Sequence, residues 1–450
     1  MLPLAMIVRE NGAEVAGSDR ALDQGRLATK FEWLKAKGIG LFAQDGSGLT
    51  SGEQILIASA AIEDSVPDVA KANGLGCARM TRAELLAEQF NGSPRSIAIG
   101  GTSGKSTVTG MIGWILTEAG LDPTIMNGAV MKNFVADDAP FASSRVGDGG
   151  IMVSEVDESD GSIALFNPEI AVLNNVSLDH KSLEELRQLF GDFAGKAKHC
   201  IWNLDDSETA ALVGALDLSD TISFGFSKEA GFRATDIEEA PISSRFTLSA
   251  EGSDFEVKMQ VPGRHNIANA LAAIAAASAV GVPVATSVAA IAQFDGLARR
   301  FDVVGTAHDI SVIDDFGHNP DKIAATLKTM KAFPGRVIAF FQPHGFGPIH
   351  KMGAELAEVL SDILDGDDRV ILCDPVYFGG TVDRSIGSAF ITDAVNAAGG
   401  TAEHIADRAD CGAHIVDMAQ PGDRIVIMGA RDDTLSIFAS DILAQLAAKP

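Results

Sequence analysis

The sequence predicts an α/β protein with mostly parallel sheets, and three features of the chain support this fold class. First, short and almost wholly apolar runs recur along the chain, as is typical of strands buried on both faces of a parallel sheet. Second, segments with helical periodicity separate these runs, so that strands and helices alternate. Third, turn-rich breaks near residues 91–94 and 294–301 predict three domains, over residues 1–92, 93–297 and 298–450. The candidate strands are 54–59, 96–100, 150–154, 170–174, 337–341, 369–373 and 424–428.

The composition indicates a folded protein outside the nucleic-acid-binding and membrane classes. The chain has 450 residues, 46% of them hydrophobic, and its 35 Lys and Arg against 61 Asp and Glu give a net charge of −26. This acidity disfavours nucleic acid and anionic membranes as partners, because phosphate groups are bound by clustered Lys and Arg. No apolar stretch reaches the roughly 18 residues that a membrane helix needs, and the four cysteines are widely spaced. We therefore expect a cytoplasmic protein, either a monomer or a homodimer.

Helical periodicity is clearest directly after the second candidate strand. Apolar side chains recur at three- and four-residue spacing over residues 108–119, and Gly120 can end this helix. An alanine-rich helix is predicted over residues 268–280. Before it, residues 245–248 and 255–261 read as short alternating strands, which predicts a small antiparallel part within the middle domain.

A glycine-rich run, GGTSGKST at residues 100–107, lies between that strand and the helix that follows it. Glycines let the backbone wrap closely around phosphate oxygens, and the amides at a helix start favour an anion. Lys105 adds a mobile positive charge, and Ser106 can place its hydroxyl on Mg²⁺. The first glycine is one position nearer the lysine than in the usual GxxxxGK[ST] spacing, because Ile99 occupies that place. The run predicts a phosphate-binding loop, and the alternative is an ordinary glycine turn followed by a chance lysine.

Carboxylate and imidazole side chains follow the next two candidate strands. Residues 155–160, EVDESD, begin at a strand end, and Glu155 is the best candidate to bind Mg²⁺ beside the phosphate-binding loop. The alternative is that this acidic run is solvated surface. Residues 174–180, NNVSLDH, place His180 at the carboxyl end of a strand, where α/β sheets gather their ligands. A single histidine is more often structural. His180 is a candidate functional residue only because of the motifs near it.

Three further runs carry polar side chains that could meet a ligand. Asn266 and Asn269 lie on nearly the same face of the alanine-rich helix, where an amide can pair with a base edge, although Asn266 can also simply cap the helix. Residues 299–300 are two arginines at a predicted domain joint, and a later strand ends in the polar turn DDFGHNP, which holds Asp315 and His318. Taken alone, each of these runs is more often structural than functional.

In chain order, these motifs resemble those of the Mur ligase family, the ATP-dependent amino-acid ligases of peptidoglycan synthesis. The similar runs are GGTSGKST, EVDESD, NNVSLDH, GRHNIANALAA, FDGLARRF and DDFGHNP, and residues 17–19 and 57–62 extend the resemblance into the first domain. The runs EVDESD, FQPH at 341–344 and PGDRIVIMGA at 421–430 are most similar to the branch that joins L-alanine to UDP-N-acetylmuramate. The branch that recycles murein tripeptide is also similar, notably at residues 173–175.

The resemblance implies a fold and a reaction. The fold is a Rossmann-like N-terminal domain, a central P-loop ATPase domain and a Rossmann-like C-terminal domain, which would bind the UDP-sugar, ATP and the amino acid, respectively. ATP would phosphorylate the substrate carboxylate, the amine of an amino acid would attack the acyl phosphate, and phosphate would leave. The implied partners are a nucleotide-sugar carboxylate and an amino acid, with ATP and Mg²⁺ as cofactors.

The resemblance also implies roles for individual residues. The implied ATP site comprises Gly101, Thr102, Ser103, Gly104, Lys105, Ser106, Thr107, Asn266, Asn269, Arg300 and Asp315. Lys105 would hold the β- and γ-phosphates, and Arg300 would reach the phosphates from the third domain. Asn269 would meet the adenine and Asp315 the ribose. The implied metal ligands are Ser106, Glu155 and His180, the catalytic residues are Lys105, His180 and His318, and the UDP-sugar contacts are Ser18, Asp19 and Ser59. His318 would lie near the attacking amine.

Several runs depart from the family pattern. The strand and GxGGxGM loop that usually open the first domain have no counterpart in the sequence, so we expect either a truncated start or an incomplete nucleotide-sugar site. The family's GHHP is GHNP at 317–320, and FQPH continues as GFGP at 345–348 instead of the arginine-bearing RYxRT of the L-alanine branch. This difference leaves the amino acid open. Phe190 falls near the place where some branches carry a carbamylated lysine, so none is assigned.

Alternatives to the L-alanine ligase stay open. The chain could be a murein tripeptide recycling ligase or a Mur-like ligase of other specificity. It could also be a non-catalytic, nucleotide-gated binding protein descended from these ligases. A folate-type polyglutamate ligase shares the central chemistry, but the domain containing residues 17–19 argues against it. An oxidoreductase is disfavoured, because no GxGxxG follows a candidate strand near either end.

Overall fold

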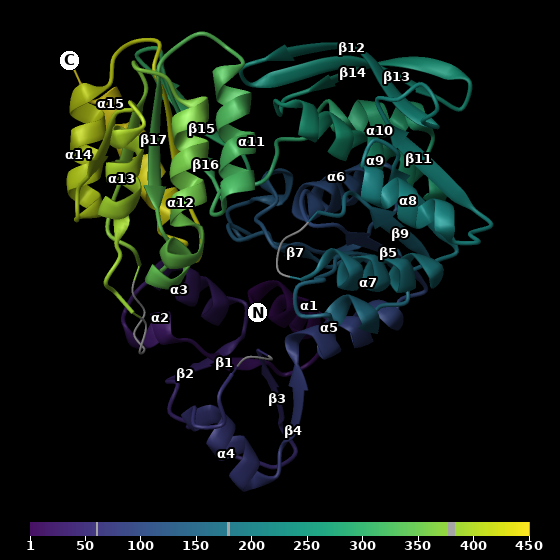
Figure 1. The fold of residues 1–450 in the computed structure, drawn as a ribbon. Helices are drawn as coiled ribbons and strands as arrows, with labels where there is room; N and C mark the ends of the chain where they lie inside the picture. The colour runs from purple at the N-terminus through teal and green to yellow at the C-terminus, as the bar shows by residue number, and fades with distance from the viewer. Residues whose placement is uncertain (60–61, 178–180, 377–382, 450) are drawn as a thin grey trace. The chain divides into compact units, whose positions relative to one another are not determined.

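The computed structural model describes residues 1–59, 62–177, 181–376 and 383–449 (Figure 1). The described chain divides into two compact units. The first unit comprises Met1–Glu238, Arg245–Gln260 and Arg264–Asp295, and the second comprises Glu239–Ser244, Val261–Gly263 and Gly296–Pro450. Each unit has its own large sheet and its own hydrophobic core.

Parallel strand pairs linked by helices form the N-terminal part of the first unit. β1 (Ala16–Ser18) pairs with β2 (Gly40–Phe42), and β3 (Ile55–Ala58) pairs with β4 (Ala78–Thr81). The helices of this part are α1 (Leu2–Glu10), α2 (Arg20–Asp23), α3 (Ala28–Ala36), α4 (Pro67–Leu75) and α5 (Arg82–Asn91). Parallel neighbours need a crossover connection, and the helices between the paired strands supply it.

A ten-stranded sheet dominates the described part of the first unit, in the order β14-β13-β12-β11-β10-β9-β5-β8-β6-β7 (Figure 1). Its strands are β5 (Arg95–Gly100), β6 (Thr124–Met126), β7 (Ser144–Arg145), β8 (Ile151–Glu155), β9 (Ile170–Leu173), β10 (His199–Asn203), β11 (Thr221–Gly225), β12 (Phe232–Ala240), β13 (Ser243–Ala250) and β14 (Ser253–Met259). Neighbours from β6 to β12 are parallel, whereas β7 is antiparallel to β6. Turns of two residues join β12, β13 and β14, and neighbouring strands joined so tightly run antiparallel, as predicted.

The helix α6 (Lys105–Glu118) shows how local sequence sets the site. Its aliphatic side chains and Met111 are buried between Val108 and Leu116, and it packs against the alanine-rich helix α9 (Arg264–Val280). Burial of this helix fixes its first turn, and therefore Lys105 and Ser106, at the end of β5. The remaining helices of this part are α7 (Leu183–Gly195), α8 (Ser207–Ala215) and α10 (Val284–Ile291), with short 3₁₀ turns at Lys132–Phe134 and Ser162–Leu165.

Three sequence motifs lie at one edge of this sheet. β9, β5 and β8 are neighbours and parallel, so their carboxyl ends meet at the same edge. The glycine-rich run follows β5, the acidic run 155–160 begins at the last residue of β8, and residues 174–177 follow β9. Ligands of α/β proteins gather at this edge, so the topology makes it the candidate site.

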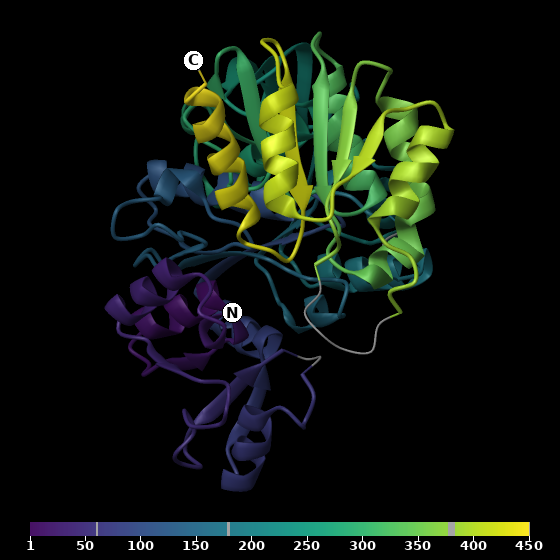
Figure 2. The same ribbon diagram turned by 90° about the vertical axis from the view of Figure 1, so that its left-hand side faces the viewer.

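A six-stranded sheet forms the core of the second unit, as far as the structure describes it, in the order β15-β16-β20-β17-β18-β19 (Figure 2). Its strands are β15 (Asp302–Ala307), β16 (Ile310–Asp315), β17 (Val337–Gln342), β18 (Arg369–Leu372), β19 (Ala402–His404) and β20 (Arg424–Gly429). β15 is antiparallel to β16, and the other pairs are parallel. The helices are α11 (Pro320–Lys331), α12 (Phe346–Ile363), α13 (Ser388–Ala397), α14 (Arg408–Met418) and α15 (Leu435–Ala447).

Helices cover both faces of this second sheet. One hydrophobic cluster joins β17 to α11, α12 and α13 through residues such as Leu327, Leu356 and Ile391, and another joins it to α14 and α15 through Ile415 and Ile442. This doubly covered parallel sheet is the Rossmann-like arrangement that the resemblance implies.

The sequence predicted these elements closely. Each of the seven candidate runs is a strand in the described structure, with ends shifted by at most one residue. The domain boundaries at residues 92 and 297 stay predictions. Among the described residues, no helix combines the length and the apolar character needed to cross a membrane.

Candidate active site

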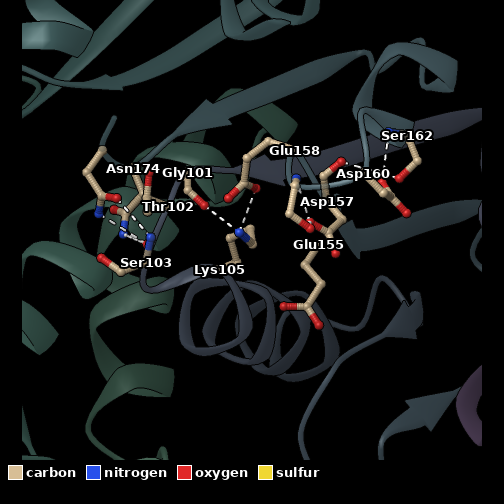
Figure 3. Close-up of polar contacts among 12 residues, drawn as sticks. Gly101, Thr102, Ser103, Lys105, Glu155, Asp157, Glu158, Asp160, Ser162 and Asn174 are labelled. Atoms are coloured by element: carbon tan, nitrogen blue, oxygen red, sulfur yellow. Dashed lines mark hydrogen bonds and ion pairs between the residues drawn. The ribbon is translucent and has the colours of Figure 1, made fainter. Parts of the chain in front are cut away.

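The glycine loop, residues 100–104, turns sharply between β5 and α6 (Figure 3). Gly101 has φ 138° and Gly104, which caps α6, has φ 82°, so both adopt backbone conformations that favour glycine. A Cβ on Gly104 would collide with the side chains of Asn174 and Asn269. The glycines therefore let the backbone of the loop approach other groups closely, as the motif predicts for phosphate oxygens.

Asn175 holds two backbone amides of the glycine loop. Thr102 N donates to the Asn175 carbonyl at 3.2 Å, and Ser103 N donates to Asn175 Oδ1 at 2.9 Å. Thr102 Oγ1 also donates to Ser177 O at 3.1 Å and accepts from Ser177 N at 3.0 Å. The segment after β9 thus fixes the loop, and the amides at the start of α6 are the ones that lack intrahelical partners and can face an anion.

The ammonium of Lys105 is paired with a carboxylate of the acidic loop, residues 155–160. Lys105 Nζ donates to Glu158 Oε2 at 2.7 Å and to Gly101 O at 2.6 Å (Figure 3). Glu158 is only 5% exposed, so this is a largely buried ion pair and not a solvated contact.

Ser106 and Glu155 place two side-chain oxygens next to each other. Ser106 Oγ donates to Glu155 Oε2 at 2.7 Å, at the point where β8 ends and α6 begins. A hydroxyl and a carboxylate fit Mg²⁺, which prefers oxygen ligands. The predicted third ligand, His180, lies outside the described residues, and within those residues no group of three or more His, Cys, Asp or Glu is placed to hold a metal ion.

The other carboxylates of the acidic loop have partners of their own. Asp157 accepts from Ser159 N at 2.9 Å and from Ser159 Oγ at 2.7 Å, and Asp160 accepts from Ser162 N at 2.9 Å. Burial alone would raise the pKa of Asp157, but the Ser159 hydrogen bonds, with the charges of Lys105 and Arg82, hold that pKa below its usual value. The loop therefore presents ordered anions beside the lysine.

A row of buried amides lies behind the glycine loop. Asn269 Nδ2 donates to Asn266 Oδ1 at 3.2 Å, and Asn269 Oδ1 accepts from Asn174 Nδ2 at 3.1 Å. Asn174 Nδ2 also donates to Ser103 O at 2.9 Å. Asn269 is 3% exposed, and its amide is engaged by protein side chains at both ends. The adenine contact of Asn269 stays a prediction.

In the second unit, Asp315 is held by three hydrogen bonds within the protein. Its carboxylate accepts from Phe301 N and Gly317 N, both at 2.8 Å, and from Thr326 Oγ1 at 2.9 Å. The guanidinium of Arg300 lies 4.4 Å from the centre of the Phe316 ring. These contacts order Arg300 and Asp315, the two residues of this unit that the family resemblance implies for the ATP site.

His318 and His344 lie next to each other beside an apolar pocket of the second unit. Their ring centres are 5.4 Å apart, and the pocket lining also includes Phe341, Ile349 and Met352. Burial lowers the pKa of each imidazole to about 4, so both are neutral at pH 7. His318 Nδ1 lies 2.8 Å from the Phe316 carbonyl, which requires a proton on Nδ1 and leaves Nε2 as an acceptor.

Two domains of one protein family together match most of the chain. The Mur ligase middle domain matches residues 99–277, and the domain described as "Mur ligase, glutamate ligase domain" matches residues 299–431. The chain belongs to the Mur ligase family. Members of this family are ATP-dependent ligases that form carbon–nitrogen bonds.

Relatives of this Mur ligase cover most of its length. A UDP-N-acetylmuramate–L-alanine ligase from Acidithiobacillus ferrooxidans is 35% identical over 398 residues, which cover 84% of this chain and 81% of that protein. One from Streptomyces coelicolor is 33% identical over 375 residues, covering 80% and 78%.

Solved structures share the fold. A UDP-N-acetylmuramate-alanine ligase from Thermotoga maritima has a TM-score of 0.80 at 24% identity, covering 99% of this chain and 96% of that one. A murein peptide ligase from Psychrobacter arcticus has a TM-score of 0.70 at 24% identity, covering 100% and 97%. The fold class predicted from the sequence, with three α/β domains, is therefore confirmed.

The structure places some of the predicted site residues next to one another and others elsewhere. Lys105, Ser106 and Glu155 meet at one sheet edge of the first unit. The predicted UDP-sugar residues lie elsewhere in that unit, at the ends of β1 and β3: Ser18 Oγ donates to Asp68 at 2.5 Å, Asp19 caps α2, and Ser59 is exposed. Their contact with a UDP-sugar stays a prediction, as does the nucleotide contact of Thr107.

Sequence reasoning did not single out three residues whose contacts order the predicted motifs within their own units. Glu158 was counted with an acidic run that could be solvated, yet it binds Lys105. Asn175 belongs to the strand-end run that was chosen for His180, yet it fixes the glycine loop. Arg299 was noted as one of two arginines, yet it is buried. The available signal was position, since Glu158 and Asn175 lie inside candidate ligand-binding runs and Arg299 directly precedes Arg300.

Proposed function

We propose that this Mur ligase joins L-alanine to the carboxylate of UDP-N-acetylmuramate, using ATP and forming an acyl phosphate. The observation that carries the proposal is the meeting of Lys105, Ser106 and Glu155 at the carboxyl edge of the central sheet. The names of the curated relatives support the choice of substrates. The cytoplasmic location and the monomeric or homodimeric state expected from the sequence belong to the same proposal.

Phosphoryl transfer is the first step of the proposed reaction. A free carboxylate is a poor electrophile, so one of its oxygens attacks the γ-phosphorus of ATP, and ADP leaves. Lys105 holds the phosphates and stabilises the negative charge that shifts toward ADP. Mg²⁺ bound by Ser106 and Glu155 would neutralise further phosphate charge. The substrate carboxylate becomes an acyl phosphate, whose carbonyl carbon is open to attack.

Amide formation is the second step. The uncharged amine of the amino acid attacks the carbonyl carbon, the carbon–oxygen bond to phosphate breaks in the tetrahedral intermediate, and the proton that the nitrogen loses passes to the departing phosphate or to water. His318 is neutral at pH 7, and its Nε2 can accept a hydrogen bond from the amine. We place Arg300 on the ATP phosphates and Asn269 near the adenine in this proposal.

A panel of acceptors tests the substrate assignment. With ATP, Mg²⁺ and UDP-N-acetylmuramate, phosphate release should depend on L-alanine and exceed the rate with glycine, L-serine or L-glutamate. Equal rates with all amino acids, or release with none of them, would contradict the L-alanine assignment.

A murein tripeptide recycling ligase is the second candidate. The fold likeness to a murein peptide ligase and the GFGP run in place of the arginine-bearing run favour it. Replacing L-alanine by L-alanyl-γ-D-glutamyl-meso-diaminopimelate separates the two candidates, because a recycling ligase would use the tripeptide in preference to alanine.

A further inference from the structure

The turn that carries Arg300 has unusual backbone geometry on both sides. Arg299 has φ 61° and Phe301 has φ 46°, and neither residue is glycine. Non-glycine residues adopt positive φ only where their surroundings hold them there. The contacts of the two flanking residues therefore decide where the backbone of Arg300 lies and in which direction its side chain leaves.

The Arg299 side chain anchors the first flank within the second unit. Arg299 is 8% exposed; its Nη2 donates to Gly429 O at 2.6 Å, and its Nη1 donates to Asp432 O at 3.2 Å. Its Nε lies 3.4 Å from Asp314 Oδ1. The guanidinium thus ties the turn to the end of β20 and to β16 at once.

Asp314 completes this anchor. It is 1% exposed, and its second oxygen accepts from Ser436 Oγ at 2.8 Å. Burial raises the pKa of Asp314, and the nearby Arg299 charge opposes that rise. Removing one partner of a buried ion pair leaves the other without compensation, so each member depends on the other.

Backbone contacts hold the second flank. Phe301 N donates to Asp315 Oδ2 at 2.8 Å, and Phe316 N donates to Arg299 O at 2.9 Å. Arg300 Nη1 donates to the same Arg299 carbonyl at 3.0 Å, and its guanidinium packs over the Phe316 ring. The turn and the end of β16 therefore form one connected set of contacts.

We propose that Arg299, paired with Asp314, is a positioning residue that presents the Arg300 guanidinium to the phosphates of ATP. This inference rests on the proposed function, in which Arg300 meets those phosphates. Arg299 itself is bound to Gly429, Asp432 and Asp314 and acts through its neighbour. The competing explanation is that Arg299 and Asp314 only stabilise the core of the second unit.

Arg299→Lys is the direct variant, because lysine keeps the charge but cannot reach three acceptors at once. Arg336→Lys is a matched control in the same unit. Arg336 pairs with Asp423 at 2.5 Å and donates to Met418 O at 2.8 Å. It directly precedes β17, at the end of the sheet opposite to the Arg299 turn. Asp314→Asn tests the same anchor from its other side if Arg299→Lys does not fold.

Amide hydrogen exchange tests the anchor without using activity. At temperatures equally far below each melting temperature, the amides of Phe301 and Phe316 should exchange at least about tenfold faster in Arg299→Lys than in wild type, since both belong to the anchored turn. Arg336→Lys should leave them unchanged. Unchanged exchange in Arg299→Lys, or an equal rise in the control, would overturn the positioning role.

A double-mutant cycle tests whether Arg299 acts through Arg300. Arg299→Lys should lower kcat/KM for ATP about tenfold, whereas adding it to Arg300→Lys should lower that value less than about twofold further. Losses that multiply would overturn the inference. An Arg300→Lys protein with normal ATP kinetics would instead refute the phosphate contact in the proposed function, and the exchange measurement would still decide whether Arg299 holds the turn.

Discussion

Lys105 Nζ lies 2.7 Å from Glu158 Oε2, so the cation of the phosphate-binding motif is paired with a largely buried carboxylate. A triphosphate that enters this site brings several negative charges close to Glu158. The nucleotide must therefore either share Lys105 with Glu158 or draw it away. If Lys105 binds ATP as proposed, Glu158 should lower the affinity that the lysine alone would give.

Removal of the Lys105 charge should abolish most activity. Lys105→Ala should lower the rate of ligation at least about a hundredfold, because the ammonium stabilises charge that develops as the γ-phosphoryl group departs. The rate is measured by phosphate release with saturating substrates, and circular dichroism checks the fold. Lys228→Ala, at an exposed lysine that pairs with Glu229 at 3.6 Å, is the control and should be fully active. Near-normal turnover in Lys105→Ala would refute the phosphate role of this lysine.

Glu158→Gln should bind nucleotide more tightly than wild type. Glutamine keeps the shape of the side chain but removes the anion that competes for Lys105, so the affinity for a non-hydrolysable ATP analogue should rise at least about threefold. Isothermal titration calorimetry measures this dissociation constant. Glu208→Gln removes a carboxylate that pairs with Arg187 on an exposed part of the first unit and should leave the affinity unchanged. A higher dissociation constant in Glu158→Gln than in wild type would show that the glutamate assists nucleotide binding.

The metal proposal predicts a specific change in Mg²⁺ dependence. Glu155→Gln should raise the Mg²⁺ concentration for half-maximal activity about tenfold or more, because a hard cation prefers a carboxylate to an amide. His180→Ala should have a smaller effect if its contact with the metal runs through water. Activity is titrated against Mg²⁺ at fixed ATP for both variants. Curves that overlay the wild-type curve would be incompatible with a paired-metal site.

The histidine pair predicts a loss of stability in mild acid. The pKa of both His318 and His344 is about 4, below the usual value of about 6.5, so between these values the unfolded chain binds protons that the folded protein does not. The free energy of unfolding should therefore fall as the pH drops from 7 to 5, on the order of 1 kcal/mol for each histidine.

Urea unfolding at pH 7 and pH 5 measures this effect. The double variant His318→Gln with His344→Gln should lose much of the pH dependence. His308→Asn is the control, since His308 is exposed and its φ of 49° suits asparagine. A double variant with the wild-type pH dependence would contradict the assignment of that dependence to these residues.

Local sequence was enough to predict the strands and the phosphate-binding motif. Buried parallel strands are wholly apolar and short, so the runs that became β5, β8 and β9 were recognisable without tertiary information. Because the carboxyl ends of parallel strands share an edge, the same reasoning placed Lys105 and Glu155 together, and the structure confirms that they lie there.

The partners of these residues could not be predicted in the same way. Whether a carboxylate of the acidic loop is buried depends on how that loop packs, so nothing local distinguished Glu158 from Asp157 or Asp160. Two anchors of Arg299, Gly429 and Asp432, lie at or just after the end of β20, about 130 residues later in the chain, and only the sheet order brings them to Arg299. Positive φ at Arg299 and Phe301 likewise has no sequence signal, since such geometry usually marks glycine.

Isotope transfer from the substrate carboxylate tests the central claim most directly. UDP-N-acetylmuramate labelled with ¹⁸O in both carboxylate oxygens is incubated with ATP, Mg²⁺, L-alanine and the protein, and the released phosphate is analysed by mass spectrometry. Ligation through an acyl phosphate predicts that each phosphate carries one ¹⁸O atom, because the oxygen that attacked the γ-phosphorus leaves with it. Phosphate that carries no ¹⁸O would contradict the account, most clearly if it is released at the same rate without L-alanine.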